Sequence, residues 1–214
     1  MIFIHKDYRV KKFLITIILV SSTSAATAGG FYIGTSLAFS DTQHASTVKE
    51  TGNDDITEDV GISGPAFSVF GGYQYDINDT VFTAFELSLL GSRASGDADI
   101  DGTKASIDQK TGLGVSVLLG RQLGEGALFG RFGLQQTLYE LSAENSSESY
   151  DGPHTGYKFG LDYRLPLNDS FQVQMGWSRT FYSEETYYSR PGTGYSLNFE
   201  PTESLFELAI AKKF

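Results

Sequence analysis

Five oxygen-bearing residues of the sequence have the spacing of a calcium-binding loop: Asp97, Asp99, Asp101, Thr103 and Asp108. Calcium prefers several oxygen ligands, and a glycine at the sixth position, here Gly102, permits the sharp turn that such a loop needs. However, Lys104 stands where an apolar residue is usual, and no helical pattern flanks the segment. The segment is therefore either a weak calcium site or the solvated acidic tip of a hairpin.

Three acids and three bases share one parity in segments whose other parity is bulky and apolar: Glu86, Arg131, Lys158, Asp162, Arg164 and Glu207. If these segments are strands, side chains of one parity point to one face, so the six charges face the same way. Unpaired charge is costly inside a protein, so acids and bases should neutralise each other there. Glu86 and Arg131 are expected to pair. The set predicts a polar plug, with a gated ion path as the alternative.

Catalysis would have to use the two histidines that follow residue 28, His44 and His154. A catalytic base needs an oriented partner and a nucleophile within reach, and the sequence shows no such set. His154 begins a segment on the polar parity, where a hydrogen-bonding role is expected. We therefore predict that the protein is not an enzyme and holds no cofactor.

Tyrosines gather late in the chain among charged residues: Tyr182, Tyr187, Tyr188 and Tyr195, with Glu184, Glu185 and Arg190. Exposed tyrosines with polar neighbours suit contacts with a partner, but the same residues also suit packing that orders a loop. Arg179, just before them, is expected either to meet a lipopolysaccharide phosphate or to extend its charged end to water. The sequence leaves both pairs of alternatives open.

Eight segments alternate between bulky apolar and small or polar residues, which is the pattern of strands with two unlike faces. They cover residues 31–39, 67–75, 81–89, 112–120, 128–138, 156–165, 171–181 and 206–214. The joints 76–79, 124–126 and 166–169 are short, whereas 40–64, 91–110, 140–153 and 183–203 are long and polar. This arrangement predicts an all-β fold: an eight-stranded antiparallel up-and-down transmembrane β-barrel with periplasmic termini and four extracellular loops.

The apolar parity should face lipid and the polar parity the interior, which is the reverse of a soluble barrel. Aromatic residues fall near both ends of the segments, as two interfacial girdles require. The last long stretch contains a further alternation of Tyr195, Leu197 and Phe199 whose parity does not match Phe206. We expect a bulge or break at Pro201 and a wall that extends beyond the membrane.

The first 28 residues have the pattern of a secretory signal peptide, with basic residues before an apolar run that is too short to span a membrane. Ala26-Thr27-Ala28 supplies small residues for cleavage, which we place after Ala28, with Ala26 as second choice. A single barrel domain then covers 29–214. It has 12 basic and 25 acidic residues, and this net charge near −13 argues against nucleic acid as a partner. The chain has no cysteine, so neither a lipoprotein anchor nor a disulfide is expected.

The final segment resembles the closing strand of bacterial outer-membrane barrels, whose terminal aromatic residue is part of the signal read by the barrel-assembly machinery. The residues that carry this resemblance are Phe206, Leu208, Ile210 and Phe214, and Lys212 departs from it. The glycine-rich strands and interior charges are similar to those of the OmpA transmembrane domain and of OmpX-like surface proteins. The resemblance implies a monomer in the outer membrane of a Gram-negative bacterium, in contact with lipopolysaccharide. We expect no peptidoglycan-binding domain after Phe214.

The function that follows is a structural or adhesin-like surface role, in which four extracellular loops meet a host or other extracellular ligand. A narrow pore for ions or small solutes is the alternative. A lipid-modifying enzyme is a more distant one, because His44-Ala45-Ser46 resembles the His-x-Ser of outer-membrane lipid A deacylases.

Overall fold

The computed structural model describes residues 29–49, 56–100, 103–143, 149–190 and 195–214. Within them the chain is almost entirely β-strand, because a period-two alternation suits an extended backbone. The strands are β1 (Gly30–Lys49), β2 (Ile56–Asn78), β3 (Val81–Ser92), β4 (Ser95–Ile100), β5 (Thr103–Leu123), β6 (Gly126–Ala143), β7 (Ser149–Pro166), β8 (Phe171–Tyr182), β9 (Glu185–Arg190) and β10 (Tyr195–Lys213). Among these residues, no helix is long and apolar enough to cross a membrane.

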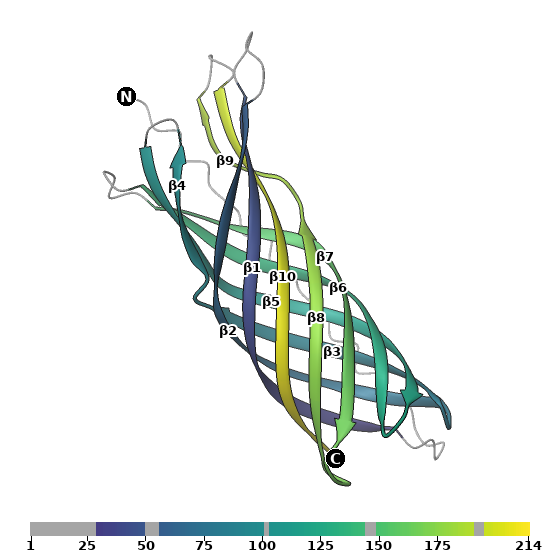
Figure 1. Ribbon diagram of the computed structural model, residues 1–214. Helices are drawn as coiled ribbons and strands as arrows, with labels where there is room; N and C mark the ends of the chain where they lie inside the picture. The colour runs from purple at the N-terminus through teal and green to yellow at the C-terminus, as the bar shows by residue number, and fades with distance from the viewer. Residues whose placement is uncertain (1–28, 50–55, 101–102, 144–148, 191–194) are drawn as a thin grey trace.

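Eight of these strands close into a ring in which every neighbour is antiparallel. The order is β1, β2, β3, β5, β6, β7, β8 and β10, and β10 pairs back to β1 from Lys213 to Ser196. Figure 1 shows the strands as a tilted wall that closes on itself. The predicted eight-stranded up-and-down barrel is thus confirmed, since each strand pairs with the next ring strand along the chain.

Tight turns join the strands at one end of the barrel. The turn between β5 and β6 places Gly124 at a φ of 63°, which glycine adopts without the steric cost of a side chain. In the turns after β2 and β7, the side-chain oxygens of Asn78 and Asn168 accept hydrogen bonds from backbone amides two and three residues later, at 2.9–3.0 Å. These side chains fold the chain back sharply, as in other turns that use asparagine.

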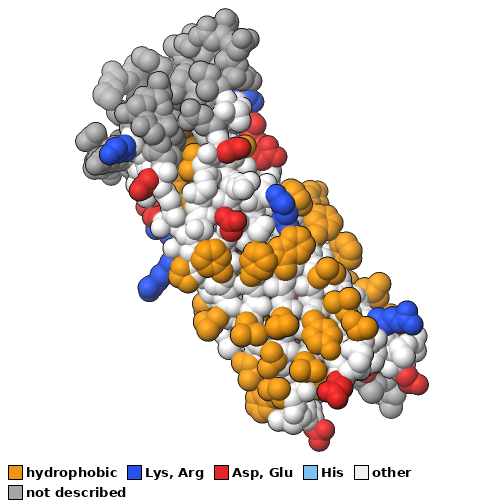
Figure 2. Space-filling model, viewed as in Figure 1, with side chains coloured by type: hydrophobic (Ala, Val, Ile, Leu, Met, Phe, Trp, Pro, Cys, Tyr) orange, Lys and Arg blue, Asp and Glu red, His pale blue; other side chains and the backbone are white. Residues whose placement is uncertain are grey.

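The outer face of the ring carries the bulky apolar residues. Phenylalanine, leucine and valine side chains of the predicted outward parity are exposed, including Leu37, Phe85, Phe132 and Leu208. In Figure 2 the hydrophobic side chains cover the middle of the barrel, while charged side chains lie toward its two ends. An apolar band of this kind faces lipid in a membrane barrel, and the predicted assignment of the two faces is confirmed.

The four stretches expected to be loops are largely strand. β1 and β2 continue to Lys49 and from Ile56, and β5, β6, β7 and β10 also extend well beyond the 9–11 residues that a membrane crossing needs. β4 continues the line of β3, and β9 that of β8. The expectation was wrong because the alternation reverses outside the membrane. There the outward residues meet water and are polar, so the segments look like loops in the sequence.

The strand register shows which residues of β5 and β10 point inward in this outer part of the barrel. In β5 the pairing with β6 shifts between Gln109 and Gly112, so the inward residues change from odd numbers up to Gln109 to even numbers from Gly112 onward. In β10 the register with β1 continues without a shift through Pro201, whereas on the other edge the pairing passes there from β8, which ends at Thr202 with Phe181, to β9, which begins at Phe199 with Glu185. The expected break is therefore present on one edge of β10 only. Phe199 and Phe206 differ in parity because Phe199 is buried inside the wall, whereas Phe206 is exposed on it. The expected extension of the wall is confirmed.

Candidate functional site

Four of the six predicted interior charges form one network in the middle of the barrel. Arg131 donates from Nη1 to Glu86 and from Nε to Asp162 Oδ2 at 2.9 Å. Arg164 donates from Nη2 to the other oxygen of Glu86 at 3.0 Å. All four side chains are buried. Two acids and two bases therefore compensate each other at hydrogen-bond distance, which offsets the cost of taking them out of water.

Aromatic rings join this network toward the short-turn end. The Tyr32 hydroxyl donates to Glu86 Oε2 at 2.9 Å, and the Arg164 guanidinium lies over the rings of Tyr32 and Phe129, at 4.8 and 4.6 Å from their centroids. A buried apolar cluster fills the barrel around them: Tyr32, Phe70, Ala84, Leu118, Phe129, Ala209 and Ala211. The network is thus capped by packed side chains on its short-turn side.

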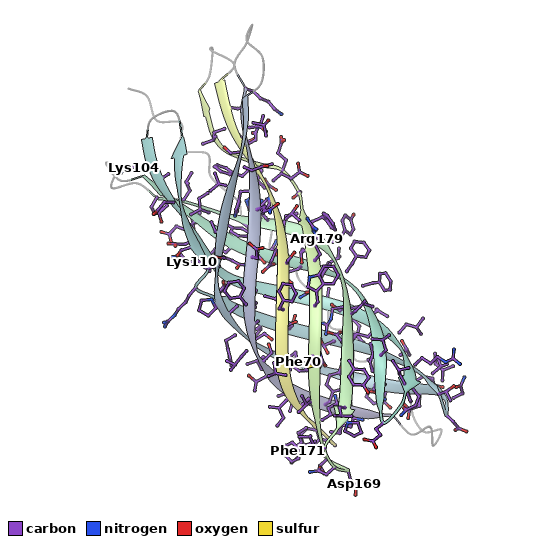
Figure 3. The ribbon with its side chains drawn as sticks, viewed as in Figure 1. Phe70, Lys104, Lys110, Asp169, Phe171 and Arg179 are labelled. Atoms are coloured by element: carbon purple, nitrogen blue, oxygen red, sulfur yellow. The ribbon has the colours of Figure 1, made fainter. Side chains whose placement is uncertain are left out.

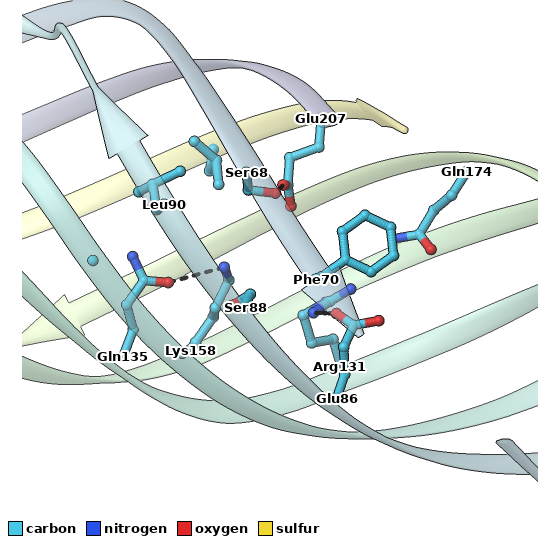
Figure 4. A pocket seen from close by; sticks show the side chains of 13 residues that line it. Ser68, Phe70, Glu86, Ser88, Leu90, Arg131, Gln135, Lys158, Gln174 and Glu207 are labelled. Atoms are coloured by element: carbon cyan, nitrogen blue, oxygen red, sulfur yellow. Dashed lines mark hydrogen bonds and ion pairs between the residues drawn. The ribbon is translucent and has the colours of Figure 1, made fainter. Parts of the chain in front are cut away.

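The other two predicted charges, Lys158 and Glu207, do not join the ion pairs. Lys158 donates from Nζ to Gln135 Oε1 at 2.9 Å, and Glu207 Oε1 accepts from the hydroxyls of Ser36 and Ser68 at 2.9 and 3.3 Å. Figure 4 shows both residues at the cavity between the ion network and the outer half of the barrel. The cavity volume is about 10 Å³, which is room for about one water molecule.

A second polar layer, centred on Glu203, lies above this cavity. Glu203 accepts hydrogen bonds from four neutral groups: Ser40 Oγ at 3.0 Å, Gln109 Nε2 at 2.7 Å, Gln135 Nε2 at 3.1 Å and the Tyr182 hydroxyl at 2.6 Å. Glu203 was not predicted as an interior residue, because in the sequence it stands at the end of a long polar stretch expected to be a loop. The signal was present, since Glu203 continues the inward parity of Glu207 in steps of two.

Above this layer the barrel divides into two sheets, which together we call the head. The first sheet is the outer part of β2, β1 and β10 with β9, and the second is β4 with the outer part of β5, β6 and β7. Along the described strands, pairing between β2 and β4 consists of Ser63 with Ser95, and pairing between β7 and β8 ends at Gly156 with Tyr182. In Figure 1 the tips of β9 and β10 stand apart from β4.

An apolar core packs between the two sheets. The first sheet contributes Ile62, Leu197 and Phe199, and the second contributes Ala105, Ile107, Tyr139 and Leu141, with Tyr182 of β8 beneath them. Since these inward residues are apolar, the head is a closed sandwich rather than the mouth of a channel. Burial of this core holds the sheets together, because apolar surface removed from water is the main stabilising contribution.

The histidines and Tyr182 lie inside this part of the molecule. His44 and His154 are 1% and 0% exposed, and Ser46 is also buried. Tyr182 is buried and hydrogen-bonded to Glu203, so it follows the packing alternative that was left open for these tyrosines and not the partner-contact one. Its inward parity from Gln172 and Gln174 on β8 is the reason. The side chains of Tyr187, Tyr188, Arg190 and Tyr195 lie outside the described residues.

The candidate calcium ligands lie along a hairpin formed by β4 and β5. Asp97 pairs with Ser106 across it, Asp99 with Lys104 and Ser95 with Asp108, so the backbone at these positions is extended and not curved into a loop. Asp108 accepts from Lys110 Nζ at 3.0 Å, and Lys110 also reaches Glu140 at 3.1 Å. Asp101 lies outside the described residues. Among the residues that are described, no group of three or more histidine or acidic side chains suits a metal ion.

The remaining predicted features are the C-terminal apolar residues, Arg179 and the signal peptide. Phe206, Leu208, Ile210 and Phe214 are exposed on the outer face of β10. Arg179 is exposed on the outside of β8, with its guanidinium 5.4 Å from the ring centroid of Phe181. Figure 3 shows Arg179 between the two ends, which Lys104 and Asp169 mark. The predicted signal peptide and its cleavage site at Ala28 lie outside the described residues.

The lipid-facing band, closed ring and polar interior define an integral β-barrel membrane protein. The family model of the outer membrane protein beta-barrel domain matches residues 13–200, which is most of the chain. The protein therefore belongs to this family and is a β-barrel protein of the Gram-negative outer membrane. No curated protein matches its sequence.

Several solved structures of outer-membrane proteins are similar to this chain at low sequence identity. Outer membrane protein OprG from Pseudomonas aeruginosa has a TM-score of 0.58 at 15% identity, covering 88% of this chain and 97% of OprG. The attachment invasion locus protein Ail of Yersinia pestis has a TM-score of 0.44 at 13% identity, covering 84% and 98%. The outer membrane protease OmpT from Escherichia coli has 0.49 at 8% identity, covering 91% and 99%.

Proposed function

We propose that the protein is a non-enzymatic surface-interaction protein, adhesin-like in its role, whose head meets a partner outside the cell. The observation that carries this proposal is the head itself. Six ring strands of 18–23 residues continue past the 9–11 needed to cross the membrane and pack into a two-sheet body. Ordering so much backbone costs conformational entropy, which argues for a use of the head's outer surface.

The same geometry disfavours a pore. The interior is filled by the ion network, by the apolar layer around Phe129 and by the core of the head, and the cavity between them has room for about one water molecule. An eight-stranded barrel is only wide enough for its own side chains. The interior charges therefore serve as a structural plug in this proposal.

Catalysis is also disfavoured. His44 and Ser46, which would form the His-x-Ser of a lipid-modifying enzyme, both point into the buried interior of the head. His154 is fully buried as well. A general base must reach the substrate proton, and these side chains have no access to a lipid or to solvent.

A headless barrel tests the surface role. In the register of β1 with β2, Gln43 pairs with Gly61, so residues 44–60 can be replaced by an Asn-Gly turn. The other three parts of the head are replaced by turns in the same way: residues 95–108, 140–151 and 184–200. Heat-modifiable migration on gels should show that the shortened chain still forms a barrel. Whole cells with the intact protein should bind matrix or serum proteins, and headless cells should not. Equal binding by both would refute the proposal.

The expected partners of the barrel wall are proposals of the same kind. The apolar band and Arg179 at its outer edge suit lipopolysaccharide, because a guanidinium can bind a phosphate with two hydrogen bonds. The outward apolar residues of β10 suit recognition by the barrel-assembly machinery. Replacing Arg179 with Gln and measuring lipopolysaccharide that copurifies with the barrel would test the first contact.

A further inference from the structure

Two buried histidines face each other across the head, one from each sheet. His44 belongs to β1 in the first sheet and His154 to β7 in the second, and the ring of Tyr139 lies between them. The ring centroids of His44 and Tyr139 are 4.9 Å apart at 89°, and those of Tyr139 and His154 are 5.4 Å apart at 85°. The contact of His44 with Tyr139 therefore joins the two sheets, and His154 packs on the same Tyr139 ring from the neighbouring strand β7 of the second sheet.

The surroundings of His44 do not favour a charged imidazole. It packs against Tyr139 of β6 and Phe199 of β10, and its Nε2 is buried with no hydrogen-bond partner among the described residues. Charge on His44 and charge on His154 repel each other. His154 donates from Nδ1 to the backbone carbonyl of Ser183 at 3.2 Å, which fixes its ring.

The acidic groups around the pair are already engaged or face outward. Glu203 of β10 lies one inward position below His44, where four neutral donors hold it. Glu140 of β6 borders the same small cavity as His44 and bonds Lys110. Asp59 of β2 is exposed and Asp108 of β5 lies on the outward parity. Tyr182 of β8 is held by Glu203.

This burial makes stability of the closed head depend on pH. Burial, with the charge of His154 as a smaller cause, lowers the pKa of His44 to about 3. Burial also lowers the pKa of His154 to about 4, although the Ser183 carbonyl opposes the shift. In an open head both imidazoles would return to about 6.5. Because the folded pKa values are the lower ones, the closed head loses stability as pH falls below 6.5.

The strand register shows where the two sheets of the head can separate. Within each sheet, continuous ladders join β2 to β1 to β10 and β4 to β5 to β6 to β7. Between the sheets, the described pairing stops at Ser63 with Ser95 on one side and at Gly156 with Tyr182 on the other. One backbone hydrogen bond, from Ser183 N to the Thr155 carbonyl at 3.0 Å, lies just beyond the second of these points. Farther out along the described strands no ladder pairing joins the two sheets, and the side chains of the apolar core hold them together, so their separation breaks few backbone hydrogen bonds.

We propose that the head is an acid-opened clamp: protonation of His44 and His154 separates the two sheets and exposes the apolar core, while the membrane ring stays closed. This opening presents Ile62, Ile107 and Phe199 to solvent at low pH. It is a property of the head itself and does not require the adhesin role.

Spin labels can measure the separation, because the chain has no cysteine that would take up label elsewhere. Lys104→Cys on β5 and Glu200→Cys on β10 place labels on exposed positions of the second and first sheets. Electron–electron distances are measured for the full barrel in nanodiscs between pH 7 and pH 4.5. Two protons taken up on opening should raise the opening constant on the order of a thousandfold over this range. A longer distance should therefore appear reversibly in acid.

Variants separate the histidines from the nearby carboxylate. His44→Phe or His154→Phe alone should halve the slope of the logarithm of the opening constant against pH, and the double variant should stay closed at pH 4.5. Glu203→Gln should open in acid like the parent chain. An unchanged distance in the parent at pH 4.5 would overturn the proposal. So would acid opening of the double histidine variant, since another group would then be the trigger.

Discussion

Removing the carboxylate of Glu86 should destabilise the barrel strongly. Glu86 accepts hydrogen bonds from two guanidiniums, Arg131 and Arg164, and from the Tyr32 hydroxyl. Glu86→Ala would leave two buried cations with Asp162 as the only acid of the four-charge network. We expect the free energy of unfolding to fall by about 3–5 kcal/mol, because a buried guanidinium loses its compensating charge.

A double-mutant cycle shows whether the two residues act directly on each other. Arg131→Met alone should cost a similar amount, since Asp162 loses its 2.9 Å partner and Glu86 one of two. The double variant removes one charge of each sign and leaves Arg164 with Asp162, which lie within electrostatic range. The summed single costs should therefore exceed the double cost by about 1–3 kcal/mol.

Urea titration of the barrel in lipid vesicles, followed by the fluorescence of Trp177, measures each free energy of unfolding. Trp177 is the single tryptophan and lies on the lipid face, so its emission reports loss of the membrane environment. Glu86→Ala with Lys110→Met is the matched control, because Lys110 also is a cation but bonds Asp108 and Glu140 in the head, away from the interior network. That pair should be additive within about 0.5 kcal/mol. Strict additivity of Glu86 with Arg131 would refute the reasoning.

Two further substitutions probe the outer face and the second polar layer. Val117→Arg places a charge on the lipid-facing side of β5 opposite Phe85 and Phe132, and it should cost about 2–4 kcal/mol in vesicle unfolding; an unchanged urea midpoint would contradict the membrane assignment. Glu203→Ala leaves the buried Tyr182 hydroxyl without its 2.6 Å acceptor and should cost about 1–3 kcal/mol; a neutral effect would show that water replaces the carboxylate.

The membrane part of the fold could be predicted because the bilayer imposes one rule on every strand. Lipid selects bulky apolar residues on alternate positions, so Phe31, Phe85 and Leu208 mark the outer face, and the polar parity marks the interior. Short joints with turn-forming residues, such as Gly124, then fix the order of the strands. For the same reason the sequence alone places Glu86 and Arg131 inside the barrel.

The head could not be predicted, because water surrounds it and the rule reverses. There Ile107, Leu141 and Phe199 point inward while their neighbours are polar, which in the sequence looks like a loop with scattered apolar residues. The shift between Gln109 and Gly112 also changes parity within one strand. The position of this shift is set by the backbone pairing, and the types of the side chains around it do not locate it.

The sequence also could not predict which interior side chains contact one another. Parity places Lys158 and Asp162 on the same face, but the stagger of the strands sets which side chains meet at one height. Asp162 therefore meets Arg131, while Lys158 meets Gln135 and Glu207 meets two serines. A sequence gives the face of each residue, and the heights come from the closed ring.

Conductance in planar lipid bilayers tests most directly the claim that the barrel is sealed and acts through its outer surface. The purified chain should insert at neutral pH without stepwise current, because the ion network, the apolar layer and the core of the head fill its interior. Insertion is verified separately: protein recovered from the lipid used for the bilayers should show heat-modifiable migration on gels. Reproducible current steps of one size from the inserted barrel would contradict a sealed interior and would favour the pore instead.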